Sequence, residues 1–142
     1  MATVTGLTAE KINELVAGRV SAAEVDVEET ILALAAGDGA QGALSLGHAY
    51  RLDKLVVSGP CRLRLYASAT QRTADADRAR DVDPTGDHGC IAEFLMTADL
   101  LSLQLIPPPH GYTPDGYTYY SVVNDGVTGD FTFTLTEQVL EP

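Results

Sequence analysis

The stretch LDKLVVSGPCRLRLYAS, residues 52–68, gives the clearest structural pattern in the sequence. From Cys61 onward its side chains alternate between two faces, with the period of two that is typical of a half-buried strand. The inward set is Cys61, Leu63, Leu65 and Ala67, and the outward set is Arg62, Arg64, Tyr66 and Ser68. Because serine, glycine and proline at 58–60 are typical of a tight turn, the stretch predicts two strands that form a hairpin.

Further segments with strand-like composition follow this stretch or come shortly before it. They are 43–46, 90–96, 101–106, 117–124 and 130–137. In the last segment Phe131, Phe133 and Leu135 should point inward, with threonines between them pointing outward. The turn residues at 124–126 predict that the final two strands also pair as a hairpin. Six or seven short strands separated by turns predict a mainly β fold, a jelly-roll-like antiparallel β-sandwich.

The N-terminal residues predict a short helix over 9–18. Thr8 suits the N-cap and Gly18 the position after the last turn, while Ile12, Leu15 and Val16 fall on one side. A helix of two to three turns is marginal by itself in water. We therefore expect this apolar side to bind a partner surface, either within the chain or on another subunit.

Residues 20–36 allow two interpretations. A capping-box pattern from Ser21 to Glu24 favours a helix, whereas the β-branched residues that follow favour strands. The acidic pair Glu28 and Glu29 would interrupt a helical apolar stripe, so we favour a β-hairpin that turns there. Three glycines within 37–42 predict a flexible joint. The expected domains are an N-terminal arm at 1–40, made of the helix and the hairpin, and a β-sandwich at 41–142.

Composition limits the possible partners. The 142 residues suffice for one ordinary domain, and nine basic against twenty acidic residues give a formal net charge of -11. A surface this acidic repels phosphate backbones, so we expect no nucleic-acid partner. The first residues lack the cationic start and apolar run of a signal peptide, and no stretch has the length of a membrane span. We expect a soluble protein with no membrane partner.

The two cysteines, Cys61 and Cys90, each stand where a strand is predicted to begin. A disulfide would be possible if those strand ends were neighbours. Without a secretory context, two thiols are more often reduced, and that is the interpretation we favour. Neither cysteine belongs to a C-x-x-C motif, which argues against zinc.

Residues 69–89 form a long connection for a compact domain. Ser68 and Gln71 match a capping box, and Asp75 can reach Arg78, so the first half predicts a helix. In the second half, the acidic residues are spaced as in part of a calcium-binding loop, but Pro84 and the missing acidic ligand at the twelfth position favour a solvated turn. The calcium candidates, should the site bind at all, are Asp81, Asp83 and Asp87.

Tyrosines gather between the proline-rich loop at 107–116 and the following strand. In one interpretation, Tyr112 and Tyr120 are exposed and anchor a protein interface or stack on a sugar. In the other, Tyr117 and Tyr119 share a strand face and belong to the core, while Tyr112 and Tyr120 are merely half-exposed. The absence of tryptophan weakens the case for a sugar site.

No catalytic motif accompanies the three histidines His48, His88 and His110, so we expect neither enzymatic activity nor a cofactor. Arg62 and Arg64 are expected on an outward strand face. Such arginines are ordinarily solvated, but in an acidic chain they also suit docking of an acidic neighbouring subunit.

Several stretches resemble virion proteins of tailed phages that infect actinobacteria and similar hosts. Residues 3–10, TVTGLTAE, with the predicted helix and 20–36, resemble the N-terminal leader of minor tail and tail-fibre proteins. A second group of stretches resembles a small β-sandwich domain of virion structural proteins. It comprises AYRL at 49–52, CRLRLYASATQR at 61–72, AD at 76–77, DPTGDHG at 83–89, TADLL at 97–101 and YSVVN at 120–124. The 83–89 stretch is the most specific of these.

The resemblance implies a structural part of the virion, docked in many copies on capsid or tail subunits after synthesis in the host cytoplasm. It supplies no catalytic residues and implies a homo-oligomer, such as a trimer. Because the chain lacks the glycine-rich or collagen-like repeats of a fibre shaft, it favours a compact accessory protein, for example one that decorates the capsid. Residues 3–36 would become ordered on a neighbouring subunit. The alternative function is a carbohydrate-binding module for attachment to the host surface.

Overall fold

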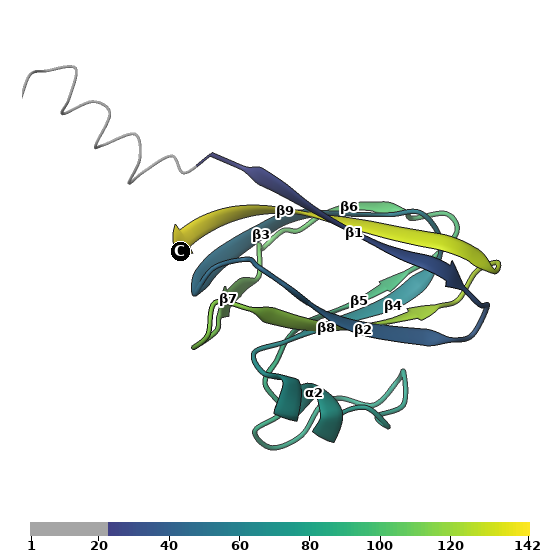
Figure 1. Ribbon diagram of the computed structural model, residues 1–142, viewed down its shortest axis with the longest axis horizontal. Coiled ribbons are helices and arrows are strands. Elements are labelled where there is room, and N and C mark those ends of the chain that lie inside the picture. Colours follow the sequence, from purple (N-terminus) through teal and green to yellow (C-terminus); the bar gives the residue numbers. More distant parts are fainter. Residues whose placement is uncertain (1–22) are drawn as a thin grey trace, which may run out of the picture.

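The computed structural model describes residues 23–142, which form a sandwich of two antiparallel sheets (Figure 1). One sheet has the strand order β1-β9-β3-β6, with β7 also pairing with β3, and the other has the order β2-β8-β4-β5. The first sheet contains β1 (Val25–Leu34), β3 (Ala49–Val57), β6 (Ser102–Gln104), β7 (His110–Tyr112) and β9 (Gly129–Glu141). The second contains β2 (Gly39–Leu44), β4 (Cys61–Tyr66), β5 (Cys90–Met96) and β8 (Thr118–Asn124). Strands adjacent in sequence mostly alternate between the sheets, which confirms the jelly-roll-like sandwich.

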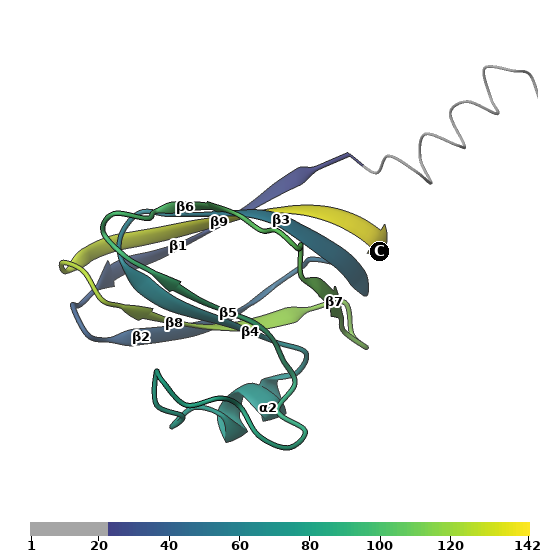
Figure 2. The same cartoon turned by 180° about the vertical axis from the view of Figure 1, so that it is seen from behind.

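The two predicted hairpins are wrong, although their strands and turns exist. β3 and β4 follow each other through the turn at 58–60, but they lie in different sheets, as do β8 and β9 (Figure 2). Each turn therefore leads the chain across the end of the sandwich rather than back along the same sheet. Alternation along a strand specifies which face is buried, and a strand can bury that face equally well in either sheet.

The hairpin predicted within 20–36 is also wrong, because residues 25–34 form the single strand β1. It pairs with β9 from Val25 opposite Glu137 to Leu34 opposite Gly129. Glu28 is exposed and Glu29 is half-buried. The residues before and after these two glutamates pair with the same strand, β9, so the chain does not turn at this point. An edge strand tolerates such charges, which also discourage pairing with foreign strands.

The domain boundary at residue 40 is corrected for the same reason. β1 and β2 both belong to the sandwich, and residues 35–38 form the turn between them. Gly37 has a φ of 83° there, and its N–H donates to the Asn124 carbonyl at 2.7 Å. The helix predicted at 9–18, with Ile12, Leu15 and Val16, lies outside the described residues.

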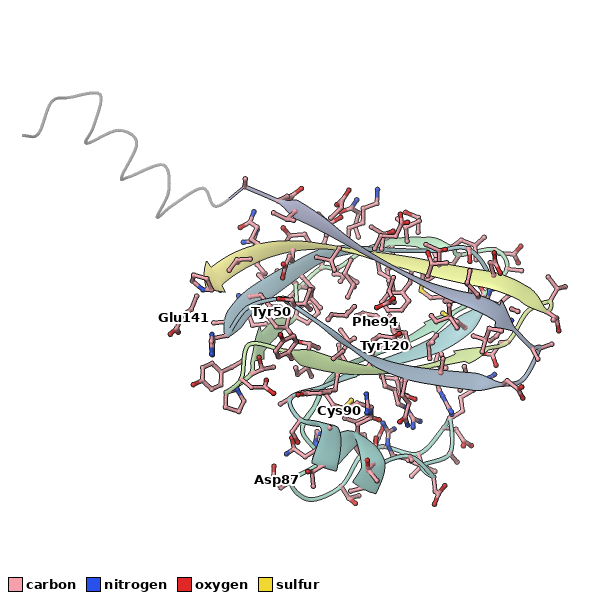
Figure 3. The ribbon with its side chains drawn as sticks, in the orientation of Figure 1. Tyr50, Asp87, Cys90, Phe94, Tyr120 and Glu141 are labelled. Carbon is pink, nitrogen blue, oxygen red and sulfur yellow. The ribbon has the colours of Figure 1, made fainter. Side chains whose placement is uncertain are left out.

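The core lies between the sheets and contains the inward residues predicted for β4 and β9. Cys61, Leu63 and Leu65 are buried, and so is the set Phe131, Phe133 and Leu135. Tyr120 packs edge-on against Phe133, with ring centroids 5.1 Å apart, and Figure 3 shows Tyr120 and Phe94 between the sheets. Both cysteines are free, as favoured from the sequence, and burial raises the pKa of the Cys61 thiol to about 12.

The connection between β4 and β5, residues 67–89, is called here the insertion. It covers the outer face of the four-stranded sheet and contains the helix α2 (Ala69–Ala74) (Figure 1). The predicted N-cap is confirmed, since the Ser68 hydroxyl accepts a hydrogen bond from the Gln71 N–H at 3.2 Å. The Ala67 N–H donates to the Gly89 carbonyl at 2.9 Å and closes the base of the insertion. Within residues 23–142, no helix is long and apolar enough to cross a membrane.

Candidate functional site

The insertion is held on the sheet by a buried cluster of ion pairs centred on Arg64. Its Nε donates to Glu93 of β5, and its Nη2 donates to the Arg78 and Ala79 carbonyls at 3.1 and 3.3 Å. A carboxylate oxygen of Asp75 lies 4.0 Å from Nη1. Arg64 is only 2 % exposed, so the prediction that it points to solvent or to a docking subunit is wrong. The outward face of β4 is buried at Arg64 and Tyr66, because the insertion forms a third layer over this part of the strand.

Arg78 completes this cluster from the insertion side. Its guanidinium donates to Asp75 and to Glu93, each at 2.8 Å, and to the Val82 carbonyl at 2.6 Å. Tyr66 donates its hydroxyl to Asp75 at 2.6 Å. Burial opposes ionisation of Asp75, but the hydrogen bonds from Arg78 and Tyr66 outweigh it and lower its pKa. Two guanidinium groups thus face two carboxylates, so the cluster is neutral as a whole.

Arg72 fastens α2 to the neighbouring strands. Its Nη1 donates to the Gly42 carbonyl at 2.8 Å and to the Tyr120 carbonyl at 3.4 Å. Its guanidinium carbon lies 5.6 Å from the centre of the Tyr119 ring, within cation–π range. The insertion is therefore bound to β2, β4, β5 and β8, which explains how a segment with one short helix holds a fixed position.

Arg62 stays on the outer face, where it is half-buried opposite Leu95 of β5. Burial and the nearby charge of Arg64 lower its pKa. It forms no ion pair with any residue in the described part of the chain, and Leu95 is about half exposed. Of the two arginines predicted to dock a subunit, Arg62 alone is placed where a partner can reach it.

The three calcium candidates are not gathered into a site. All three are exposed, and only Asp87 of the three accepts a side-chain hydrogen bond within the described residues, from Gln71 Nε2 at 3.1 Å. Asp87 contributes to a polar hollow of about 140 Å³, which it shares with Gln71, Ala74, Asp75, Thr85 and His88. Among residues 23–142, no three acidic, histidine or cysteine side chains lie close enough together to hold a metal ion.

The tyrosines are distributed differently from either sequence interpretation. Tyr120 is buried, so its predicted role in partner binding is wrong, while Tyr112 and Tyr117 are 64 % and 49 % exposed. β8 points Thr118, Tyr120 and Val122 inward. Both faces of this strand carry a tyrosine, so its composition left open which face is buried.

Asp115 organises the loop between Tyr112 and Tyr117. Its carboxylate accepts hydrogen bonds from the Tyr117 N–H at 3.0 Å and from the Tyr119 hydroxyl at 2.6 Å. The same hydrogen bonds, that from Tyr119 first, lower the pKa of Asp115. The two exposed tyrosines therefore flank a loop whose carboxylate is already engaged.

A pocket of about 350 Å³, called here the end pocket, lies at the end of the sandwich where β1 finishes. Its walls come from the β3–β4, β5–β6 and β8–β9 connections and from the adjoining ends of β8 and β9. They contain Ser58, Gly59, Pro60, Ala98, Leu101, Asn124, Gly126, Val127, Gly129, Asp130 and Phe131. The sequence did not predict this pocket, because its walls come from three separate turns that only the crossing connections bring together.

Asn124 fixes the floor of the end pocket. Its Nδ2 donates to the Leu34 and Val127 carbonyls, both at 2.9 Å, and its Oδ1 accepts from the Gly126 N–H at 2.9 Å. The side chain is 2 % exposed, so all its hydrogen-bonding groups are used inside the protein. The signal in the sequence was the Asn-Asp-Gly turn, which we interpreted only as a hairpin turn.

The opposite end of the sandwich contains a buried carboxyl group. Glu137 is 2 % exposed, and its Oε2 has no hydrogen-bond partner in the described part of the structure. Burial raises the pKa of Glu137 to about 7. Nearby, Tyr50 shares a hydrogen bond of 2.6 Å with Thr118, and burial raises the pKa of Tyr50 to about 12.

The chain matches no protein-family model, and neither curated proteins nor solved structures give a significant match. The fold by itself defines a small jelly-roll-like β-sandwich. Its insertion is held on the four-stranded sheet by ion pairs and hydrogen bonds.

Proposed function

We propose that this chain is a non-enzymatic structural subunit of a tailed-phage virion, a compact accessory protein on the capsid or tail that docks through its N-terminal segment. The observation that carries the proposal is how the stretches resembling a virion β-sandwich domain lie in space. Residues 61–72 and 120–124 belong to β4, its following helix and β8, and Arg72 joins them by its bond to the Tyr120 carbonyl. Gln71 joins the first stretch to Asp87 in 83–89. Stretches separated in sequence thus bond to one another between the four-stranded sheet and the insertion, which supports a shared structural origin for the resemblance.

The chemistry of the polar residues also favours a structural role. Arg64 and Arg78 are committed to holding the insertion. The three histidines each direct Nδ1 at nearby backbone: His48 at the Pro142 carbonyl, His88 at the Cys90 N–H and His110 at the Pro108 carbonyl. These contacts stabilise loops and the C-terminal end, and they support a structural rather than a catalytic use of the three histidines.

Immunogold labelling of purified particles with an antibody to this protein tests the proposal. Label over the head would assign a capsid decoration protein, and label at the tail would assign an adsorption component. The antibody should also be applied to particles opened with mild denaturant, because this treatment exposes an epitope that is hidden in the intact particle. Absence of label from both intact and opened particles would refute the proposal.

A truncation tests the docking segment. Because β1 belongs to the sandwich, the deletion should remove residues 1–22 and not 1–40. The shortened protein should fold, as judged by its circular dichroism, and should no longer be incorporated into particles. Incorporation at the normal level would show that the N-terminal segment is not the docking element.

A carbohydrate-binding module is the second candidate, and the exposed Tyr112 and Tyr117 favour it. Exposed tyrosine rings can stack on sugar faces. A glycan array compares the two functions directly. Binding that is lost in both Tyr112→Ala and Tyr117→Ala would favour attachment to a host glycan, whereas no binding leaves the structural role.

A further inference from the structure

The end pocket has the size of a small-molecule site. Its volume of about 350 Å³ lies near the lower end of the range for such sites, which is about 300–1,000 Å³. Pro60, Leu101 and Phe131 give its walls apolar surface. At Gly59 and Gly129 the walls consist of backbone alone, and a Cβ on either glycine would meet no atom within 4 Å. The pocket therefore has room for the apolar body of a small molecule.

One charged group lines the pocket, and it keeps an oxygen free. Asp130 is exposed, and its Oδ1 accepts a hydrogen bond from the Ala33 N–H at 3.0 Å. Its Oδ2 accepts no hydrogen bond from any residue in the described part of the chain, and its carboxylate forms no ion pair there. The other two polar side chains are engaged, since Asn124 uses all its groups as described and the Ser58 hydroxyl accepts a backbone N–H at 2.9 Å. The pocket thus joins apolar walls to a carboxylate that is available to a ligand.

The charge of the protein favours one sign of ligand. Two basic and two acidic residues lie in 1–22, so residues 23–142 hold the remaining seven basic and eighteen acidic residues, a net charge of -11. Such a surface attracts cations and repels anions. Among the residues that the structure describes, no basic one lines the pocket to offset this charge. A cation is therefore favoured over an anion, which would also face the Asp130 carboxylate.

The groups in the pocket favour an organic cation over a metal ion. Calcium takes about six to eight oxygen ligands, and no three metal-binding side chains lie close enough together anywhere in 23–142. An ammonium group needs only one carboxylate and can leave its remaining N–H groups in water. An apolar body attached to it gains free energy in proportion to the area that it removes from water. A neutral polar ligand, in contrast, would find few free partners in the pocket.

We infer that the end pocket is a binding site for a small organic cation, an ammonium group on an apolar body. The ammonium group donates to Oδ2 of Asp130, and the apolar body packs against Leu101 and Phe131. This ligand matches both kinds of surface that the pocket offers. The site is a further function beside the proposed structural role and does not rest on it.

Three matched compounds test which charge the pocket prefers. Phenylpropylammonium, phenylpropanol and phenylpropanoate share one apolar body and carry one positive charge, no charge and one negative charge at neutral pH. Nuclear magnetic resonance titration of the isotope-labelled full chain measures each dissociation constant, and the amides that shift locate the compound. Because an exposed ion pair contributes modestly, the ammonium compound should bind about two- to fivefold tighter than the alcohol, with the carboxylate weakest. The shifts should centre on the amides of Gly126, Val127 and Gly129, which line the pocket.

Two variants test the role of the carboxylate. Asp130→Asn keeps the shape of the side chain and an oxygen for the Ala33 N–H, so only the preference for the ammonium compound should disappear. Asp26→Asn is the matched control, because Asp26 also accepts a hydrogen bond, from the Thr136 hydroxyl at 2.7 Å, but lies near the other end of β1. It removes the same charge from the protein and should leave the preference intact.

Further variants test the pocket itself. Gly129→Leu places a side chain in the space beside the Gly129 backbone and should abolish the binding of all three compounds. Thr134→Leu is its control, since it adds a leucine to an outward position of the same strand and should bind as the wild type does. Ala98→Phe fills the pocket from a different connection and serves should Gly129→Leu fold poorly.

Three results would overturn the inference. Equal binding of the ammonium compound and the alcohol would make the pocket a site for neutral apolar molecules. Binding that survives both pocket-filling variants would reflect attraction of cations to the acidic surface as a whole. Absence of binding by all three compounds would remove the site. Particle labelling uses none of these compounds, so the virion role and the cation site stand or fall separately.

Discussion

Replacing Glu137 by glutamine should abolish one specific component of the pH dependence of stability. The carboxyl group is buried on the inward face of β9, where its neighbours across the sheet are Leu52 of β3 and Val25 of β1. Burial without a partner for Oε2 disfavours the charged form, and the pKa rises from 4.5 to about 7. Glutamine has nearly the same shape and does not ionise.

The sign of the effect follows from this raised pKa. Below the unfolded value of 4.5, Glu137 is protonated in both states and carries no charge penalty. As the pH rises toward about 7, the unfolded carboxyl ionises while the folded one resists, so the free energy of unfolding falls. Above about 7 the loss is complete, and the difference between the two pKa values corresponds to about 3 kcal/mol. Tyr50 also lies near this charge, which contributes to its raised pKa.

The assay is urea denaturation of the wild type and Glu137→Gln from pH 4.5 to pH 8, the range set by these pKa values. Relative to the wild type, the variant should gain about 3 kcal/mol between the two ends of this range, whatever constant difference the amide introduces. Glu28→Gln is the matched control, because it removes one negative charge from an exposed position of β1 and should show no such gain. A difference between wild type and Glu137→Gln that stays constant with pH would refute the interpretation that the buried carboxyl resists ionisation.

Three further outcomes follow from the contacts described. Arg64→Met should destabilise the protein by about 3 kcal/mol and expose the insertion to proteolysis, because it leaves the half-buried carboxylates of Asp75 and Glu93 short of a partner. Arg62→Met should change the unfolding free energy by about 0.5 kcal/mol or less, as measured by urea denaturation. Tyr120→Ala should cost about 3–5 kcal/mol through loss of its core packing, and Tyr112→Ala should leave the melting temperature nearly unchanged. Millimolar calcium should not shift the melting temperature; a clear increase would show that the acidic turn of the insertion binds the ion.

The correct predictions from sequence are those that depend only on residues close together in the sequence. The inward faces of β4 and β9 followed from alternation, and the start of α2 followed from the spacing of Ser68 and Gln71. The sequence pattern failed to predict burial where either face of a strand could be the buried one. β8 carries tyrosines on both faces, so the exposure of Tyr117 and the burial of Tyr120 could not be separated.

The sites were less accessible to sequence reasoning than the fold. Arg64 has the position of a solvated residue in an alternating strand, and only the insertion folding over it turns it into the centre of a buried cluster. Glu137 continues the alternation that points Phe131, Phe133 and Leu135 inward, and this alternation was the available signal for its burial. The end pocket had no local signal, because its walls belong to three connections.

The sequence by itself determined that the chain forms short strands and a capped helix, and which faces of β4 and β9 are buried, because these properties arise from side-chain period and capping within a few residues. Only the tertiary structure decided which strands pair. β1 bonds to β9 across about a hundred residues of sequence, as in the 3.0 Å contact between the Thr30 and Thr132 hydroxyls. Such pairings depend on how all the inward faces can be buried together, and the same global packing sets the charge environment of Arg64 and Glu137.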